Sequence, residues 1–351
     1  MKIKKQFKNL DLLEKKAKAK LNHSMSRWLI GASEFGFTEK KNREIFRKVS
    51  IVPRVLKGNS NIDLNTNFFN NKINFPLIVS PMGGLTQFDK KAELKIATNC
   101  SFNKIPYFHS NYSRYSMREI LKKNKDPSCI NSSLYLDDDL KFIKKKLHEA
   151  DFLNINSISI TVDSPIRSIS YDKMNYGYDA RKKMRKITKE LRSEILKKKL
   201  NPLNWKSIEK IRKLTQKPLI LKGILSYKDA VIAESCGVDA IWISNHGGRS
   251  SETDLSALEV LSEIRSKLKK KKTKIICDGG VRTGSDFLKT MCLGADFVGV
   301  GRPIVYALIA DKKNGLQNYF NLIQEEIKTS FVLGGIHKIH QIKKLDLKTH
   351  F

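Results

Sequence analysis

The chain has 351 residues, 40% of them hydrophobic, which is enough for a sizeable core and excludes a disordered protein. Its length fits one α/β barrel with extensions as well as it fits two domains. Lys and Arg number 67 against 35 Asp and Glu, but lysines run through the whole chain without an aromatic-interleaved basic stripe. We therefore predict no nucleic-acid partner and interpret the formal charge of +32 as compositional drift.

The N-terminal part, residues 1–74, is predicted to form a helical cap. Residues 10–21 and 39–46 are predicted to be helices, and an irregular segment follows around Val52-Pro53-Arg54. We interpret residues 1–74 as a cap on the domain that follows them, not as an independent domain.

Residues 75–351 contain about eight short apolar runs with helical patterns between them. Buried runs joined by helical crossovers indicate a parallel sheet, and eight strands are the number that closes a barrel. The predicted strands are 75–80, 105–109, 132–136, 157–162, 218–221, 240–243, 274–277 and 297–300.

Polar residues and glycines gather where these runs end, as in Pro81-Met82-Gly83, Ser110-Asn111 and Lys222-Gly223. A site assembled from the C-terminal ends of all the strands is typical of a barrel, whereas an open doubly wound sheet is the alternative. We therefore predict an α/β protein with a (β/α)8 TIM barrel and a site at its C-terminal rim.

One segment between the fourth and fifth predicted strands, residues 179–204, interrupts this regular pattern. Met184, Ile187, Leu191 and Ile195 repeat there at helical spacing among basic residues. A basic amphipathic helix can cover the barrel mouth or lie on an anionic membrane. We favour a helical lid or insertion, and peripheral membrane contact through 179–204 stays open.

The strongest motif, Ser244-Asn245-His246-Gly247-Gly248-Arg249, follows the strand 240–243. A histidine can take a proton at neutral pH, an arginine offers a fork of donors to a carboxylate, and glycines let a substrate approach the backbone. Taken alone, the motif fits a tight turn with a structural histidine equally well.

Two glycine loops, Asp278-Gly279-Gly280-Val281-Arg282 and Gly301-Arg302-Pro303, follow the last two predicted strands. Barrels bind phosphate groups at this position, so we favour phosphate binding over ordinary glycine turns. Lys222, at the end of the run 218–221, faces the barrel mouth, where it could form a Schiff base or stabilise negative charge on a cofactor. A lysine that only reaches solvent is the alternative.

These motifs resemble those of the FMN-dependent 2-hydroxy-acid oxidase and dehydrogenase family, which includes glycolate oxidase, lactate oxidase, L-lactate dehydrogenase and mandelate dehydrogenase. The resemblance extends from Ile51-Val52-Pro53-Arg54-Val55-Leu56 through Thr161-Val162-Asp163-Ser164-Pro165 to Gly301-Arg302-Pro303, nearly the whole chain. It implies an FMN-binding barrel without a metal site, which oxidises an L-2-hydroxy acid to the 2-oxo acid and passes the electrons to oxygen or an electron carrier.

The resemblance also implies residue roles. His246 would be the base that removes the substrate's α-proton or hydroxyl proton, Asp163 would hold the resulting imidazolium, and Lys222 would lie near flavin N1. The implied substrate-binding residues are Arg249, Tyr135, Arg27 and Arg167. The implied cofactor-binding residues are Gly83, Ser110, Thr161, Lys222, Ser244, Asp278, Gly279, Gly280, Arg282, Gly301 and Arg302.

Several positions depart from the family pattern on the substrate side. Arg27 stands where the family usually has tyrosine, and Ser170 replaces a second substrate-side arginine, although Arg167 lies close by. Ser133 stands where the family typically has the glutamine of a Gln-Leu-Tyr run. After Arg249, Ser250-Ser251-Glu252 stands where the family has Gln-Leu-Asp. The resemblance therefore predicts the reaction class, with a lactate-like or larger substrate.

Two other functions compete with this one. The first is an FMN-dependent isoprenyl diphosphate isomerase, which would not need the pair of His246 and Arg249. The second is a flavin-binding barrel whose activity is lost or changed by the substrate-side substitutions.

Location and assembly are predicted from weaker signals. Five scattered cysteines without a C-x-x-C pair, no apolar leader and no window typical of a membrane span indicate a cytoplasmic protein, or one peripheral to the membrane. The family resemblance implies a homo-oligomer, a tetramer.

Overall fold

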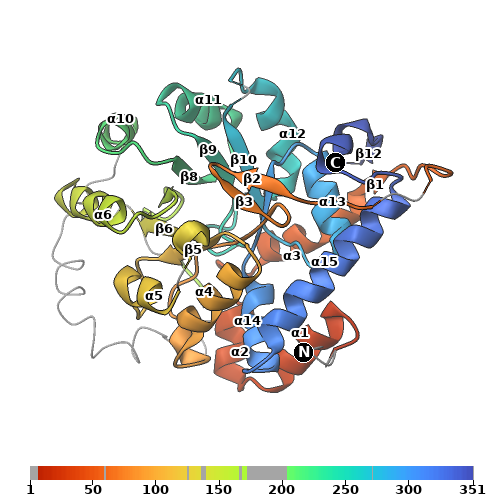
Figure 1. Ribbon diagram of the computed structural model, residues 1–351, viewed down its shortest axis with the longest axis horizontal. Helices are drawn as coiled ribbons and strands as arrows, with labels where there is room; N and C mark the ends of the chain where they lie inside the picture. The colour runs from red at the N-terminus through yellow and green to blue at the C-terminus, as the bar shows by residue number, and fades with distance from the viewer. Residues whose placement is uncertain are drawn as a thin grey trace.

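A closed barrel of eight parallel strands forms the centre of the protein, seen in a computed structural model that describes residues 7–58, 61–124, 126–135, 140–165, 168–171, 204–270 and 272–350 (Figure 1). The strand order is β10-β11-β4-β5-β6-β7-β8-β9, so strands consecutive in the chain are neighbours and β11 closes against β4. The strands are Leu77–Val79 (β4), Tyr107–Ser110 (β5), Ile130–Tyr135 (β6), Ile158–Thr161 (β7), Leu219–Ile224 (β8), Ala240–Ile243 (β9), Lys274–Asp278 (β10) and Phe297–Val300 (β11). The predicted (β/α)8 barrel is confirmed.

Helices alternate with the strands and cover the outside of the barrel. They are Ala92–Phe102 (α4), Met117–Lys123 (α5), Leu140–Phe152 (α6), Trp205–Lys213 (α10), Tyr227–Ser235 (α11), Ala257–Lys267 (α12), Gly284–Cys292 (α13), Arg302–Ala310 (α14) and Gly315–Leu333 (α15). Short 3-10 turns span Leu85–Gln87, Pro127–Cys129 and Ile339–Lys344. Capping boxes at Ser256 and Thr283 start α12 and α13, because each side chain accepts a backbone N–H of the first turn.

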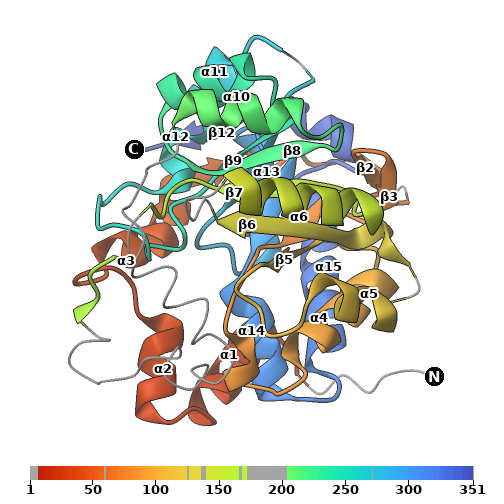
Figure 2. The ribbon, with the colours of Figure 1, turned by 90° about the vertical axis from the view of Figure 1, so that its left-hand side faces the viewer.

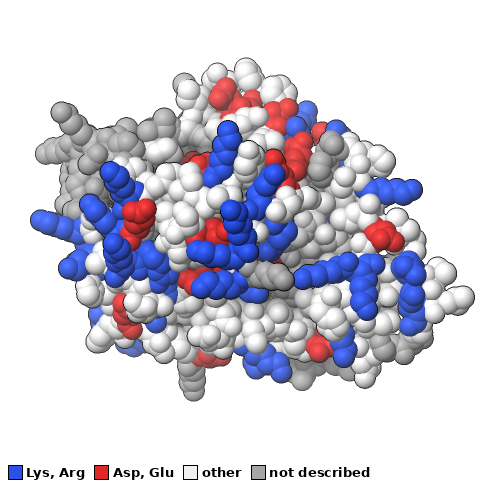
Figure 3. All heavy atoms as spheres, turned by 90° about the horizontal axis from the view of Figure 1, so that it is seen from above, with Lys and Arg blue, Asp and Glu red and all other residues white. Residues whose placement is uncertain are grey.

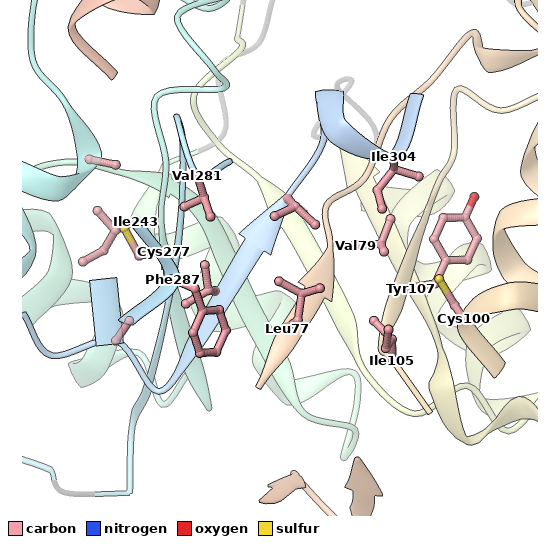
Figure 4. Packing of buried hydrophobic residues seen from close by; sticks show 14 of the residues in the cluster. Leu77, Val79, Cys100, Ile105, Tyr107, Ile243, Cys277, Val281, Phe287 and Ile304 are labelled. Atoms are coloured by element: carbon pink, nitrogen blue, oxygen red, sulfur yellow. The ribbon is translucent and has the colours of Figure 1, made fainter. Parts of the chain in front are cut away.

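Most strands are apolar on both faces because both faces are covered, and exceptions include β6 and β7, which bury Asn131, Ser132, Ser133 and Ser159. Leu77 and Val79 of β4 point outward and pack in one cluster with Phe287 of α13 and Ile304 of α14 (Figure 4). The side chains that alternate with the outward-facing ones form a second buried cluster, within the barrel. Largely apolar strands are therefore what this architecture favours.

The N-terminal segment forms the helices Leu10–Ala19 (α1), His23–Ile30 (α2) and Phe37–Glu44 (α3), followed by a 3-10 turn over Ile45–Lys48. Leu10, Leu13 and Ala17 line the buried face of α1, which packs against α14 and α15. Helix α3 lies at the end of the barrel toward which the strands run (Figure 2). The cap thus contacts the rim where the site is expected.

The opposite end of the barrel is closed by a hairpin of β2 (Thr66–Phe68) and β3 (Asn71–Ile73). The Phe68 ring packs edge-on against Phe297, with centroids 5.0 Å apart, and against Phe108 at 6.0 Å. Strand β1 (Val49–Ile51) pairs antiparallel with β12 (Leu347–Thr349) near the C-terminus. Sequence reasoning did not predict these strands, because three residues are too few to show a period.

Lys and Arg side chains are spread over the face of the molecule in Figure 3, with acidic side chains among them. Within the described ranges, no helix has both the length and the apolar character needed to cross a bilayer. All five cysteines carry free thiols. The predicted lid at 179–204 lies almost wholly outside the described residues, which resume at Asn204.

Candidate active site

A layer of mostly polar side chains lines the C-terminal rim of the barrel, directly above the apolar interior. Side chains alternate between the two faces of a strand, so residues i and i+2 both point inward. The inward apolar residues are Ile78, Phe108, Ile220, Trp242, Ile276 and Phe297. The residues two positions further along the chain are Ser80, Ser110, Lys222, Ser244, Asp278 and Gly299. The strand period therefore places the site residues on top of the interior core.

His246 lies at the centre of this rim between two polar partners. Its Nδ1 is 3.1 Å and 3.3 Å from the carboxylate oxygens of Asp163, which follows β7, and its Nε2 is 3.0 Å from the hydroxyl oxygen of Tyr135. Because a carboxylate only accepts hydrogen bonds, Nδ1 carries the hydrogen and Nε2 presents its lone pair to the Tyr135 hydroxyl. Nε2 is therefore the atom that can take a proton.

Asp163 is ionised at this site although it is buried. Burial opposes its charge, but the nearby His246 and Lys222 and hydrogen bonds from His246 and Ser250 outweigh that effect and hold the pKa of the Asp163 carboxyl at about 2. A permanent carboxylate beside Nδ1 stabilises the imidazolium that forms when Nε2 accepts a proton. The pair has the geometry of a general base and its orienting acid.

The loop that carries His246 requires glycine. His246 itself has a φ of 58°, followed by Gly247 at 66° and Gly248 at 76°, all in the left-handed region. A Cβ on Gly248 would lie 2.7 Å from the backbone nitrogen of Glu39 in α3. Only glycine allows the loop to turn back this tightly against the cap.

Arg249, at the end of the same loop, is held against the C-terminus of α2. Its guanidinium donates to the carbonyl oxygens of Leu29 at 3.1 Å and Trp28 at 2.9 Å, and it lies 5.0 Å from the centre of the Trp28 ring. Burial and the neighbouring Arg302 lower the pKa of Arg249 to about 10, so it remains charged at neutral pH. A buried cation three residues from His246 can bind a substrate carboxylate.

Lys222 is buried at the rim, with 2% of its surface exposed. Its ammonium donates to the hydroxyl of Ser244 at 2.9 Å and lies 5.7 Å from the centre of the Trp242 ring. The Ser244 oxygen also accepts the backbone N–H of His246 at 3.1 Å. The structure therefore excludes the interpretation of Lys222 as a lysine that reaches solvent, and it connects Lys222 to His246 through Ser244.

Several buried polar atoms at the rim have no hydrogen-bond partner within the described residues. They are the hydroxyls of Ser133 and Thr161 and one carboxylate oxygen of Asp278. The other oxygen of Asp278 accepts from the Trp242 indole at 3.0 Å and the Ser80 hydroxyl at 3.1 Å. Unpaired buried polar atoms are costly, so this cluster fits a polar ligand such as the ring and ribityl chain of FMN.

Two other predicted flavin contacts lie beside this cluster. The Ser110 hydroxyl is buried and accepts the backbone N–H of Tyr112 at 3.2 Å. A Cβ on Gly83 would lie 2.9 Å from the Cβ of Tyr112, so a larger residue at Gly83 would collide with this wall of the rim. The structure therefore brings both residues to the same side of the barrel mouth.

The two predicted phosphate loops lie where β10 and β11 meet the cap. Gly279 and Gly280 have φ values of 107° and 84°, and a Cβ on Gly280 would lie 1.7 Å from the carbonyl oxygen of Asn42 in α3. Gly301 precedes the first residue of α14, a position at which helices bind anions. The loops therefore have the backbone of a phosphate site.

The arginines of these loops already have acidic partners in the cap. Arg282 Nε lies 3.3 Å from a carboxylate oxygen of Glu14 in α1, and Arg302 lies 3.0 Å from a carboxylate oxygen of Glu39 in α3. Arg302 also donates to the carbonyl oxygen of Gly247 at 2.9 Å. Both arginines thus join the loops to the cap as well as lying beside the phosphate position.

For two residues, Arg27 and Arg167, the substrate-binding role stays a prediction. Arg27 is exposed in the last turn of α2, and Arg167 lies outside the described residues. Sequence reasoning also missed Asn42, whose amide exchanges two buried hydrogen bonds with the amide of Asn245, at 2.9 Å and 2.8 Å. No periodic signal marks Asn42, because its importance comes from the packing of α3 on the rim.

Comparison with known proteins gives a consistent family. A family model described as FMN-dependent dehydrogenase matches residues 17–349. The L-lactate oxidase of Lysinibacillus sphaericus is 31% identical to the chain over 88% of the chain and 84% of its own length. The L-lactate dehydrogenase of Vibrio cholerae serotype O1 is 28% identical over 93% of the chain and 95% of its own length.

Two further matches extend this comparison. The cytochrome-type L-lactate dehydrogenase of Saccharomyces cerevisiae is 29% identical over 89% of the chain, and the match spans 56% of that protein's length. A crystal structure of mandelate oxidase superposes with a TM-score of 0.89 at 27% identity, covering 98% of this chain and 99% of that one. The fold likeness therefore includes the cap as well as the barrel.

Proposed function

The chain belongs to the FMN-dependent dehydrogenase family and is an FMN-dependent 2-hydroxy-acid oxidoreductase; we propose that its substrate is an L-2-hydroxy acid, lactate-like or larger. The observation that carries this proposal is the placement of His246. Its Nε2 faces the Tyr135 hydroxyl, and its Nδ1 lies beside the ionised carboxylate of Asp163. A buried cation, Arg249, lies three residues away for the carboxylate of such an acid. The departure from the family pattern at Arg27 supports a substrate other than glycolate.

Oxidation of a 2-hydroxy acid to a 2-oxo acid removes two electrons and two protons from the hydroxyl-bearing carbon and its oxygen. When bound, FMN supplies the acceptor for the two electrons. Nε2 of His246 takes one proton from the substrate, and the carboxylate of Asp163 stabilises the charge on the ring. Arg249 and Tyr135 orient the substrate, and Lys222 offers positive charge to the cofactor side of the rim.

The residues that would hold FMN divide between the two ends of that molecule. Thr161, Ser133 and Asp278 present unpaired buried oxygens for the ring and the ribityl chain. The glycine loops at 279–282 and 301–302 would hold the phosphate with backbone N–H groups, next to Arg282 and Arg302.

Anaerobic titration of the purified flavoprotein tests the proposed substrate. A panel of L-2-hydroxy acids of increasing side-chain size, with the D enantiomers as controls, is added while flavin absorbance is recorded. We expect bleaching by at least one L acid and no bleaching by its enantiomer. A panel that leaves the flavin oxidised would contradict the proposal, and turnover of an isoprenyl diphosphate by the same preparation would replace it.

The electron acceptor is open to direct measurement after reduction. Admitting oxygen to the reduced protein separates an oxidase, which reoxidises at once, from a dehydrogenase, which waits for an added electron carrier. The cytoplasmic location, the tetramer and membrane contact through 179–204 stay predictions from the sequence. Light scattering of the purified protein and sedimentation with anionic vesicles test the last two.

A further inference from the structure

Helix α3 of the cap begins without a capping side chain of its own. Its N-cap residue is Gly36, with a φ of 83° and no side-chain hydrogen bond to the first turn. The carboxylate of Glu252, 216 positions along the chain from Gly36, takes this place. It accepts the backbone N–H groups of Phe35 at 3.2 Å, Gly36 at 2.5 Å and Phe37 at 3.1 Å. We call this contact the Glu252 clasp.

The clasp is chemically strong for a contact between distant parts of the chain. Three consecutive N–H groups converge on one carboxylate, and hydrogen bonds to an ionised acceptor are about twice as strong as neutral ones. The positive end of the α3 dipole adds to the attraction for the carboxylate. A neutral side chain of the same size could not replace all of these interactions.

The cap segment held by the clasp also contacts the loop that carries the base. The backbone N–H of Ser33 donates to the carbonyl of Gly248 at 2.7 Å, and the Ser33 hydroxyl donates to the carbonyl of Ile169 at 3.1 Å. On the far side of the clasp, the N–H of Asp254 donates to the hydroxyl of Thr38 at 2.9 Å. Residues 33–38 are thus fastened to the 248–254 loop at three successive points.

We propose that Glu252 is a positioning residue for the substrate side of the active site, an inference that rests on the proposed function. Arg249 lies three residues before Glu252, and its guanidinium is held by the end of α2, which leads directly into the clasped segment. The clasp therefore fixes α2 and the His246 loop relative to each other. Lys222 and Asp278 make their hydrogen bonds to barrel residues, Ser244, Trp242 and Ser80, so we expect the flavin ring to depend on the clasp less than the substrate does.

The test compares Glu252→Ala and Glu252→Asp with Glu263→Ala, which removes an exposed carboxylate from α12. Anaerobic stopped-flow measurements use a hydroxy acid that bleaches the wild-type flavin. They give the substrate dissociation constant and the limiting rate of flavin reduction. Flavin fluorescence gives the FMN dissociation constant, and hydrogen exchange reports the amides of 35–37. All three measurements use the full-length protein.

We expect Glu252→Ala to weaken substrate binding and slow flavin reduction by about tenfold each, since small displacements at a reacting site have large effects. We expect the FMN dissociation constant to rise by less than tenfold, the equivalent of about 1.4 kcal/mol, because the strand-end contacts of the flavin site lie in the barrel. Glu252→Asp retains the charge and recovers most of the rate. Glu263→Ala matches wild type in every measurement.

Two results would overturn the inference. Wild-type reduction kinetics in Glu252→Ala would show that the clasp positions nothing, even if the proposed function stands. Unchanged exchange protection at 35–37 would show that the clasp does not form, whatever the substrate is. A wild-type protein that no hydroxy acid bleaches is a separate outcome, which rejects the proposed function while hydrogen exchange still decides whether the clasp exists.

Discussion

Two layers inside the same barrel, only two residues apart on six of its eight strands, have opposite chemistry. The lower layer, closed by the β2–β3 hairpin, is built from rings and branched chains such as Phe108, Trp242 and Phe297. The upper layer holds Lys222, Ser244 and Asp278, and it is the layer with unpaired buried oxygens. One strand backbone positions both layers, so the lower one supplies rigidity to the upper one without taking part in its chemistry.

This comparison explains why the site can be polar and still be well ordered. Trp242 belongs to the lower layer, yet its indole N–H holds Asp278 of the upper layer at 3.0 Å. A ring packed in the apolar layer cannot move far, and the polar group that it contacts is fixed with it. We therefore expect upper-layer substitutions to change catalysis and lower-layer substitutions to change stability.

Asp163→Asn should have the largest effect on catalysis among the substitutions that spare His246. The amide can donate a hydrogen bond to Nδ1 and so favour the tautomer in which Nε2 carries the hydrogen, and it no longer stabilises an imidazolium. We expect flavin reduction to slow by about 10²- to 10⁴-fold, as for loss of general-base catalysis. Stopped-flow absorbance measures this rate, and Asp151→Asn on the exposed face of α6 is the matched control.

The same carboxylate gives the protein an acid-labile component of stability. The pKa of Asp163 is about 2 in the folded protein, below its ordinary value of 3.8, so this contribution is complete above pH 3.8 and is lost as the pH falls through 2. The difference corresponds to about 2 kcal/mol. Denaturant titrations at pH 5 and pH 2 give the free energy of unfolding, which should fall more between these two pH values in wild type than in Asp163→Asn. Equal losses in both proteins would contradict a carboxylate that His246 and Lys222 stabilise.

Lys222→Met should have a smaller effect on rate and a distinct effect on potential. Methionine fills the buried space of Lys222 but removes the positive charge beside the proposed flavin position, so the reduced flavin is less stabilised. A hydrogen bond from a charged group contributes about 1.5 to 3 kcal/mol. Its loss would lower the reduction potential of the two-electron flavin couple by roughly 30 to 60 mV. Redox titration measures the shift, and Lys228→Met on α11 should leave it unchanged. An unaltered potential in Lys222→Met would place the lysine away from the flavin.

Phe68→Ala should have the smallest effect on catalysis and a clear effect on stability. The ring is buried at the hairpin end against Phe108 and Phe297, so its removal leaves a cavity that costs about 3 to 5 kcal/mol. The limiting rate of flavin reduction below the unfolding transition should stay within about twofold of wild type. Phe102→Ala, which removes an exposed ring from α4, should change neither quantity. A large loss of rate in folded Phe68→Ala would break the separation of the two layers.

The barrel and the upper layer were predictable because each depends on local sequence. Apolar strands with glycine or polar ends indicate a parallel barrel, and His246, Lys222 and Asp278 fall at those ends. The links between cap and rim were not predictable in this way. Asn42 pairs with Asn245, and Glu252 caps α3, across more than 200 residues, so no local pattern marks either contact.

The substrate side of the site was also hard to predict from the sequence. Arg27 is predicted to lie near the substrate because of its position in the family pattern, and its exposed side chain on α2 leaves that role a prediction. The side chains that do approach Arg249, such as Trp28, belong to a helix whose angle to the rim is set by tertiary contacts. Family motifs therefore identify the chemistry at the strand ends better than the shape of the surface opposite them.

The most direct test of this account is anaerobic flavin reduction in His246→Gln, measured with a hydroxy acid that bleaches the wild-type protein. Glutamine keeps the polarity of the side chain but cannot take a proton at neutral pH, and His148→Gln on α6 is the matched control. We predict that His246→Gln retains FMN and is reduced at least about 10²-fold more slowly, and that His148→Gln is reduced at the wild-type rate. A flavin-loaded His246→Gln that is reduced at the wild-type rate would contradict it.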